Sequence, residues 1–183
     1  MESKRLTELL RAVSFSADLP DEMLRKLAGI SHAHIFPAGR ILFEERSQNK
    51  DLDLIWSGRV ALDMQVPGHG NERVLSLGPG DLVAWSAVLD QGEMTASAVA
   101  TEDTEVVALP ADKLLAQCQA DPQLGYEIML RIARQLARRL LATRVHFLQL
   151  IAEGSIPSAS CCGGDVEQTS ANLAAAHSTH KPK

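Results

Sequence analysis

Short apolar segments separated by turn-forming residues are the feature that most constrains the fold of this 183-residue chain. They lie between about residues 32 and 109 and read AHIF, RILFE, DLDLIW, RVALDMQV, RVLSLG, TASAVA and TEVVAL. The intervening turn signals are Pro37-Ala38-Gly39, Ser57-Gly58, Pro67-Gly68-His69-Gly70 and Gly78-Pro79-Gly80-Asp81. Regularly spaced segments of this kind predict short antiparallel strands. A parallel sheet would need a helix between successive strands, so we predict a compact β-roll or barrel.

Helical patterns flank this β region on both sides. Before it, apolar residues cluster at helical spacing in two groups: Leu9, Leu10 and Val13, then Met23, Leu24 and Leu27. After it, residues 111–119 predict a short helix, and Asp121-Pro122 has the N-cap and first-turn residues of a longer one. No proline follows between residues 124 and 152, so we expect the long helix to end near Gly154.

These patterns divide the chain into four parts. We predict an N-terminal helical segment over residues 1–30, a β-roll over 31–120, a long helix over 121–154 and a disordered tail over 155–183. The tail is small, polar and aperiodic, which is typical of disorder. The fold class is therefore mainly β with flanking helices.

The long helix carries apolar residues on two neighbouring faces. One face has Met129, Ala133, Leu136, Leu140, Thr143, Phe147 and Leu150, and the other has Leu141, Val145 and Leu148. Two apolar faces on one helix indicate two neighbours, the roll and a second copy of the same helix. We predict a parallel homodimer whose interface contains Met129, Leu136, Leu140, Thr143, Phe147 and Leu150.

Composition narrows the classes of function. A net charge of −5 disfavours a surface that binds nucleic acid as a whole. No apolar run reaches the roughly 18 residues that span a membrane, and the N-terminus lacks the core of a signal peptide, so we expect a cytoplasmic protein without membrane contact. The odd number of cysteines, Cys118, Cys161 and Cys162, favours reduced thiols.

In their order and spacing, several segments resemble one known family. The segments are FPAGRILFEE, DLDLIWSGRVAL, LGPGDLV, AVATEDTEVVAL, DPQLGY and ARRLLATR. Over about residues 12–152 they resemble the cyclic-nucleotide-binding domain of the catabolite activator and fumarate–nitrate regulator superfamily. The resemblance implies an antiparallel β-roll of the double-stranded β-helix type, closed by a long C-terminal dimerisation helix.

The family binds its ligand through a phosphate-binding cassette, F-G-E-L-A-L followed by R-[TS]-A. The resemblance implies that here the cassette and the long helix supply Val83, Ala84, Trp85, Ser86, Ala87, Met94, Thr95, Ala96, Thr143 and Arg144. Ala84 stands at the family's Gly, Trp85 at its Glu and Met94 at its Arg. Both polar anchors are missing, and we also expect the Glu93 carboxylate to repel a phosphate, so cAMP is not the expected ligand. Trp85 either fills the emptied pocket or stacks on a different ligand.

The remaining candidates give weaker signals. Arg131, Arg134 and Arg138 share one helix face and could contact nucleic acid or an acidic partner, or simply form a solvated face. The spacing of Cys161, Cys162, His177 and His180 does not match a zinc site, and no catalytic constellation or cofactor motif is recognisable.

We therefore expect a non-enzymatic, homodimeric regulatory domain without a cofactor. It would sense a small-molecule effector other than cAMP or signal through a protein partner. A ligand-free dimeric scaffold is the first alternative. The second is a transcription regulator that acts through another DNA-binding protein, because the few residues after Gly154 cannot form the helix-turn-helix domain of the family, and we expect no direct DNA binding by this chain.

Overall fold

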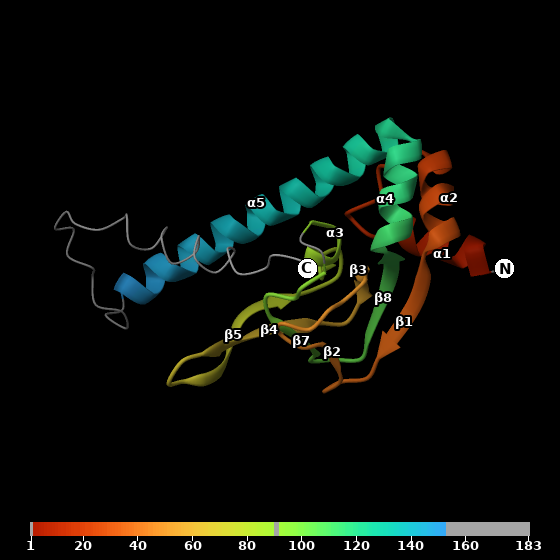
Figure 1. Ribbon diagram of the computed structural model, residues 1–183. Coiled ribbons are helices and arrows are strands. Elements are labelled where there is room, and N and C mark those ends of the chain that lie inside the picture. The colour runs from red at the N-terminus through yellow and green to blue at the C-terminus, as the bar shows by residue number, and fades with distance from the viewer. Residues whose placement is uncertain (1, 90–91, 153–183) are drawn as a thin grey trace, which may run out of the picture. The chain divides into compact units, whose positions relative to one another are not determined.

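The computed structural model describes residues 2–89 and 92–152, except the side chains of 146, 150 and 151. The helices α1 (Glu2–Ala12) and α2 (Asp21–Ile30) come first. The strands are β1 (His32–Phe36), β2 (Ile41–Phe43), β3 (Asp51–Ser57), β4 (Val60–Val66), β5 (Gly70–Leu77), β6 (Leu82–Val83), β7 (Ser97–Ala100) and β8 (Thr104–Pro110). A short helix, α3 (Ser86–Leu89), precedes β7, and α4 (Ala111–Ala120) and α5 (Pro122–Ala152) follow β8. The predicted mainly β fold with flanking helices is confirmed (Figure 1).

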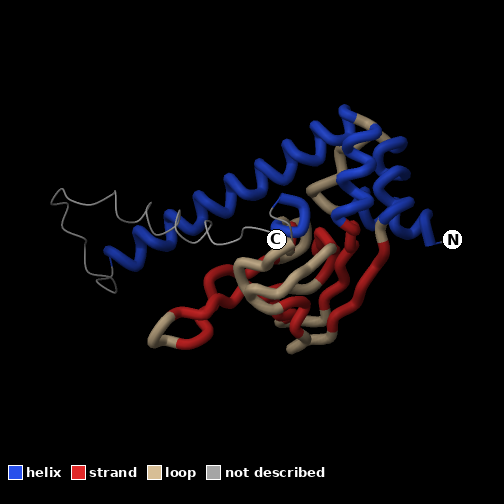
Figure 2. The backbone as a smooth tube through the Cα atoms, viewed as in Figure 1, coloured by secondary structure: helices blue, strands red, loops and turns tan. Residues whose placement is uncertain are grey.

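The strands form two antiparallel sheets (Figure 2). The first has the order β1-β8-β3-β6 and the second the order β2-β7-β4-β5. In the first sheet Leu54 of β3 lies opposite Val107 of β8 on one side and Leu82 of β6 on the other. This register places the short strand β6, which leads into the predicted cassette, beside β3 at the edge of the sheet opposite β1.

The central strand β3 of the first sheet is buried on both faces, and its successive side chains point to opposite sides. On β3, Leu52 and Leu54 belong to a core shared with the helices, and Ile55 belongs to a second core shared with the other sheet. The main members of the helical core are Leu10, Leu24, Leu27, Leu109, Leu114, Leu124, Ile128 and Ile132. Figure 1 shows α1, α2 and α4 side by side at the end of β1 and β8.

The helix signals read from the sequence are confirmed. The apolar residues assigned to the first two helices are all buried, although Val13 follows the end of α1: Leu9, Leu10, Val13, Met23, Leu24 and Leu27. Asp121 caps α5, where its Oδ1 accepts hydrogen bonds from the backbone N–H groups of Gln123 and Leu124 at 3.2 and 3.1 Å. Lys26 of α2 donates to the other carboxylate oxygen at 2.8 Å and so fixes the start of α5 to the N-terminal helices.

By its internal contacts the chain divides into two units, residues 1–140 and residues 141–183. The first unit holds both sheets, the helices α1 to α4 and the beginning of α5. The described part of the second unit is the remainder of α5, up to Ala152. The predicted disordered tail, residues 155–183, lies outside the described residues, and so do Cys161 and Cys162.

Strand β1 is one of the two edge strands of the first sheet and pairs with β8 alone among the described strands. On one of its faces His32, His34 and Phe36 stack, with successive ring centroids 5.4 Å apart. On the other face Ile35 is 67% exposed. The strand is thus a half-covered edge that carries a large apolar side chain in solvent.

Candidate ligand site

The cassette begins with a turn over residues 78–81 that a carboxylate holds closed. Oδ2 of Asp81 accepts a hydrogen bond from the backbone N–H of Gly78 at 2.9 Å. The backbone N–H groups of Gly80 and Ile55 bond to the carbonyl groups of Ile55 and Asp81, respectively, which ties the turn to β3. The turn therefore presents β6 and the residues after it at a defined position on the roll.

Ala84 follows β6 in the left-handed backbone conformation, with φ of 58°. This conformation suits glycine and is costly for a residue with a Cβ atom, and Ala84 is the position at which the resemblance expects glycine. The carbonyl group of Ala84 accepts a hydrogen bond from the N–H of Ala87 at 3.0 Å, which starts the single turn of α3. The segment after β6 thus combines a left-handed residue with a short helix, at positions where the resemblance implies the cassette.

Six of the predicted ligand residues surround one small cavity. Its wall consists of Phe43, Leu62, Ala84, Trp85, Ser86, Met94, Thr95, Ala96 and Arg139, and its volume is about 20 Å³. A cavity of this size holds about one water molecule, whereas pockets for drug-sized ligands start near about 300 Å³. The cavity is therefore closed to a nucleotide in this conformation.

Two side chains line the closed cavity at the positions of the missing anchors. Met94 is 2% exposed, and it fills the position at which the family has its phosphate-binding arginine. Trp85 lines the cavity and also packs against the helical core. This arrangement supports the interpretation of Trp85 as a filling residue rather than as a stacking platform.

The other predicted ligand residues lie elsewhere. Val83 belongs to the core between the sheets, and Ala87 is buried without lining the cavity. Thr143 and Arg144 belong to the second unit, so their ligand role stays a prediction. Glu93 is exposed and pairs with Gln48 in an isolated bridge. It does not line the cavity, so the expected repulsion between its carboxylate and a phosphate in the cavity has no support.

Arg139 of α5 is a cavity residue that the sequence interpretation missed. Its Nε and Nη2 atoms are buried, and it is a cation on an otherwise largely apolar wall. Burial lowers the pKa of its guanidinium, and the Asp81 carboxylate acts in the opposite direction. Arg139 precedes Thr143 by four residues in ARRLLATR, which places both on the same face of the helix, so this spacing was a usable signal.

The residues of α5 that were predicted to form the dimer interface differ in their exposure. Met129 and Leu136 pack half-buried against the helical core of their own chain, whereas Leu140 and Phe147 are 53% and 51% exposed. Thr143 is exposed as well, and the side chain of Leu150 lies outside the described part. Met129 and Leu136 therefore offer less surface to a second copy than the residues after them, and the dimer itself stays a prediction.

The two sheets, the turn over residues 78–81 and the flanking helices define a β-roll. The model of the cyclic nucleotide-binding domain matches residues 33–121. The chain belongs to this family.

Named relatives agree with this assignment. The chain is 39% identical over 103 residues to a cyclic AMP receptor protein of Thermus thermophilus, covering 56% of this chain and 47% of that protein. It is 30% identical over 117 residues to a CRP-like cAMP-activated global transcriptional regulator of Mycobacterium tuberculosis, covering 63% and 50%. The chain thus spans about half the length of these curated relatives.

A solved structure of a putative cyclic nucleotide-binding protein from Geobacter metallireducens is 31% identical, with a TM-score of 0.65. The match covers 73% of this chain and 97% of that one. The relatives named above are regulators or binding proteins, which agrees with the regulatory class expected from the sequence. Among the described helices, none combines the length and apolar character that crossing a membrane requires.

Proposed function

We propose that this chain is a regulatory domain that does not recognise cAMP and passes its signal through contacts of its long helix. The observation that carries the proposal is the closed cavity of about 20 Å³ between Trp85, Met94 and Arg139. It supports signalling through a protein partner, or a ligand-free scaffold, more than sensing of a nucleotide-sized effector. A smaller effector remains compatible, because Arg139 provides one cation on the cavity wall.

The missing anchors add an energetic argument. A hydrogen bond to a charged group contributes about 1.5 to 3 kcal/mol, and each 1.4 kcal/mol changes affinity about tenfold. Without an arginine at Met94 and a glutamate at Trp85, a cyclic nucleotide loses contacts worth several kcal/mol. Micromolar binding, if it depended on both contacts, would fall to the millimolar range or disappear.

Calorimetric titration with cAMP and cGMP tests the proposal. We expect the wild type to bind neither nucleotide below millimolar concentration, and micromolar binding by the wild type would refute the proposal. The double variant Trp85→Glu with Met94→Arg restores the anchors and should bind cAMP at least about tenfold more tightly than the wild type. The matched control, Trp85→Leu with Met94→Leu, opens space without adding anchors and should gain no binding. Because Met94 is buried, the folded state of each variant is checked first by circular dichroism.

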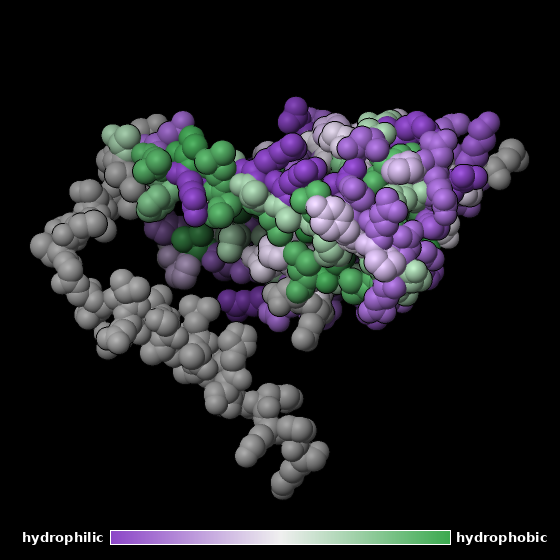
Figure 3. Space-filling model, turned by 90° about the horizontal axis from the view of Figure 1, so that it is seen from above, coloured by the Kyte–Doolittle hydropathy of each residue, from purple (hydrophilic) through white to green (hydrophobic). Residues whose placement is uncertain are grey.

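The output surface that we propose is the exposed apolar face of α5, in a homodimer with a second copy. Figure 3 shows hydrophobic side chains gathered over the far end of this helix. The exposed large apolar residues there are Leu140, Leu141, Val145, Phe147 and Leu148. Apolar faces of this kind on a long helix are typical of helix pairing. Such pairing would bring two copies of the roll into one regulatory unit.

A further inference from the structure

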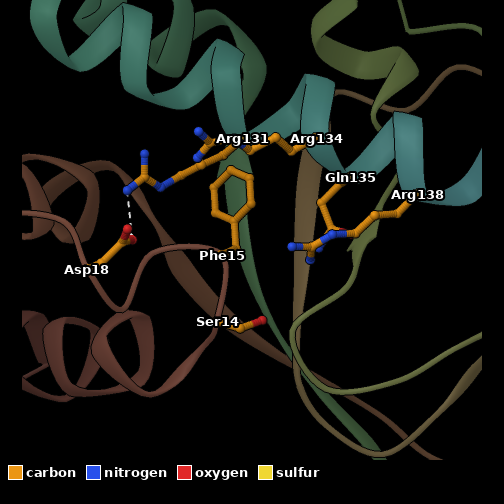
Figure 4. A pocket seen from close by; sticks show the side chains of 7 residues that line it. All are labelled: Ser14, Phe15, Asp18, Arg131, Arg134, Gln135 and Arg138. Carbon is orange, nitrogen blue, oxygen red and sulfur yellow. Dashed lines mark hydrogen bonds and ion pairs between the residues drawn. The ribbon is translucent and has the colours of Figure 1, made fainter.

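A second cavity lies where α5 passes the segment between α1 and α2. Its volume is about 170 Å³, and its wall consists of Ser14, Phe15, Asp18, Arg131, Arg134, Gln135 and Arg138. Figure 4 shows the α5 residues around Phe15, with Arg131 reaching Asp18. None of these residues lines the cassette cavity. The volume suits a small ion rather than a nucleotide, since pockets for drug-sized ligands start near about 300 Å³.

Arg131 is the structural arginine of this cavity. Its side chain is 9% exposed, and its guanidinium donates to Asp18 at 2.7 Å and also pairs with Glu127. The hydrogen bond from Arg131 lowers the pKa of Asp18, so this carboxylate stays charged and would repel an anion at its own edge of the cavity. The charge of Arg131 is thus already compensated by carboxylates.

Arg134 and Arg138 differ from Arg131, because no described residue forms an ion pair or hydrogen bond with either side chain. They are one helical turn apart, and like charges at this spacing destabilise a helix. Solvated helix faces usually carry acidic residues one turn from such arginines, but α5 has no Asp or Glu after Glu127. The Asp18 carboxylate acts on Arg134 through its charge alone. Two cations without a direct ion-pair or hydrogen-bond partner among the described residues therefore line one cavity.

Two further residues of the cavity wall, Gln135 and Ser14, contact Gly80. Gln135 donates a hydrogen bond to the carbonyl group of Gly80 at 2.9 Å and is buried. Ser14 lies against the same glycine, where a Cβ atom would meet the Ser14 hydroxyl oxygen at 2.3 Å. Gln135 and Ser14 thus connect the cavity wall to the turn that leads into the cassette, and Ser14 adds a hydroxyl group to the wall.

We propose that this cavity binds a small phosphate anion, either free or as a phosphomonoester, between the guanidinium groups of Arg134 and Arg138. Guanidinium groups donate paired hydrogen bonds that match phosphate oxygens, and a dianion compensates both positive charges at once. A monocarboxylate could compensate only one of the two. The cavity is distinct from the cassette site, but Gln135 connects it to Gly80, so an occupied cavity would stabilise the turn on which the cassette rests.

Titration calorimetry of the full chain with inorganic phosphate, at fixed pH and ionic strength, tests this proposal. We expect saturable binding to the wild type and an affinity at least about tenfold lower in the double variant Arg134→Gln with Arg138→Gln. The control, Arg25→Gln with Arg40→Gln, removes the same charge from exposed positions elsewhere and should bind phosphate as the wild type does. A melting curve of each variant without phosphate verifies that it is folded.

Three outcomes would overturn the proposal. The first is no binding of phosphate by the wild type at millimolar concentration. The second is equal weakening in both double variants, which would indicate a diffuse electrostatic effect. The third is tighter binding of malonate than of phosphate, which would assign the site to dicarboxylates. Glycerol 3-phosphate in a parallel titration separates the two phosphate sources, because tighter binding of the ester than of phosphate indicates a phosphorylated metabolite. This test is independent of the cAMP titration.

Discussion

Asp53 is a carboxyl group buried in the middle of the roll. It lies on β3 opposite Val83 and Ala108, and it is 6% exposed. Burial raises the pKa of Asp53 to about 8, and the nearby Asp51 carboxylate adds to the shift. At neutral pH the folded protein therefore keeps a proton that the unfolded chain, with an ordinary pKa near 4, releases.

This difference makes the stability of the protein depend on pH. The contribution of Asp53 is most favourable below about pH 4 and is lost as the pH rises towards 8, by about 1.4 kcal/mol per pH unit. We expect Asp53→Asn, which never becomes charged, to abolish this loss. Urea unfolding of both proteins between pH 5 and 8 measures it, with the exposed Asp112→Asn as the control. Parallel pH profiles of wild type and Asp53→Asn would contradict the assignment.

Substitutions at Gly58 and Gly68 distinguish the cost of a left-handed backbone conformation from the cost of a steric clash. Gly58 and Gly68 have nearly the same φ, 87° and 81°. A Cβ atom at Gly58 would meet the Asp103 carbonyl oxygen at 2.4 Å, whereas the space around Gly68 is open. We expect Gly68→Ala to cost about 1 to 2 kcal/mol from conformation alone, and Gly58→Ala to cost more because backbone must also move. Equal losses in urea unfolding would show that the turn at Gly58 relaxes freely.

At the level of single residues, the sequence showed which side chains occupy the cassette positions. It did not show how those side chains pack. The loss of both cassette anchors was visible directly, and the structure places Met94 and Trp85 around the same cavity. Arg139 was not predicted as a cavity residue, because only Arg131, Arg134 and Arg138 were recognised as sharing a helix face. The closure of the cavity depends on how side chains pack in three dimensions, which spacing along the chain does not encode.

For the helix α5, the sequence predicted the start and the length but not the face that packs against the core. Its start at Asp121 and its length followed from capping residues and the absence of proline. Its core-facing residues did not, because Leu124, Ile128 and Ile132 lie outside the two apolar faces read from the sequence. A helix with many apolar residues allows several faces to be assigned, and only tertiary packing selects one.

The dimer prediction can be tested on the part of α5 that its own core leaves exposed. We expect Leu140→Glu with Phe147→Glu to give a monomer in sedimentation equilibrium, since both carboxylates would have to be buried in the pair. Leu136 is unsuitable as a test position because it packs in its own protomer. Gln149→Glu, an exposed polar position on the same helix, should leave the dimer intact. A dimer that survives the double substitution places the interface elsewhere, and Leu141→Glu with Leu148→Glu would examine the neighbouring face.

For the whole molecule, the alternation of patterns along the chain was enough to predict the architecture. Short strands between turns gave the roll, and helical spacing gave the flanking helices, because burial requires each element to present an apolar side. The order of strands within the two sheets was not predicted. That order depends on pairing between β8 and both β1 and β3, which are distant in the sequence and carry no local signal of their partners.

The division of the chain leads to a prediction about its last residues. Within the described part, both cores use residues no later than Leu136. We expect a chain truncated after Gly154 to melt within a few degrees of the full-length protein, because the sequence of residues 155–183 has no periodic apolar face to bury. Differential scanning calorimetry of the two chains gives the answer, and a drop well beyond that range would show that residues 155–183 contribute to the folded structure.

The open edge at β1 affects how the protein behaves at high concentration. Unpaired backbone groups beside an exposed Ile35 form a template to which another strand can add, and natural edge strands commonly carry lysine at such positions to prevent this. Association beyond the proposed α5 dimer should therefore begin along β1, edge to edge.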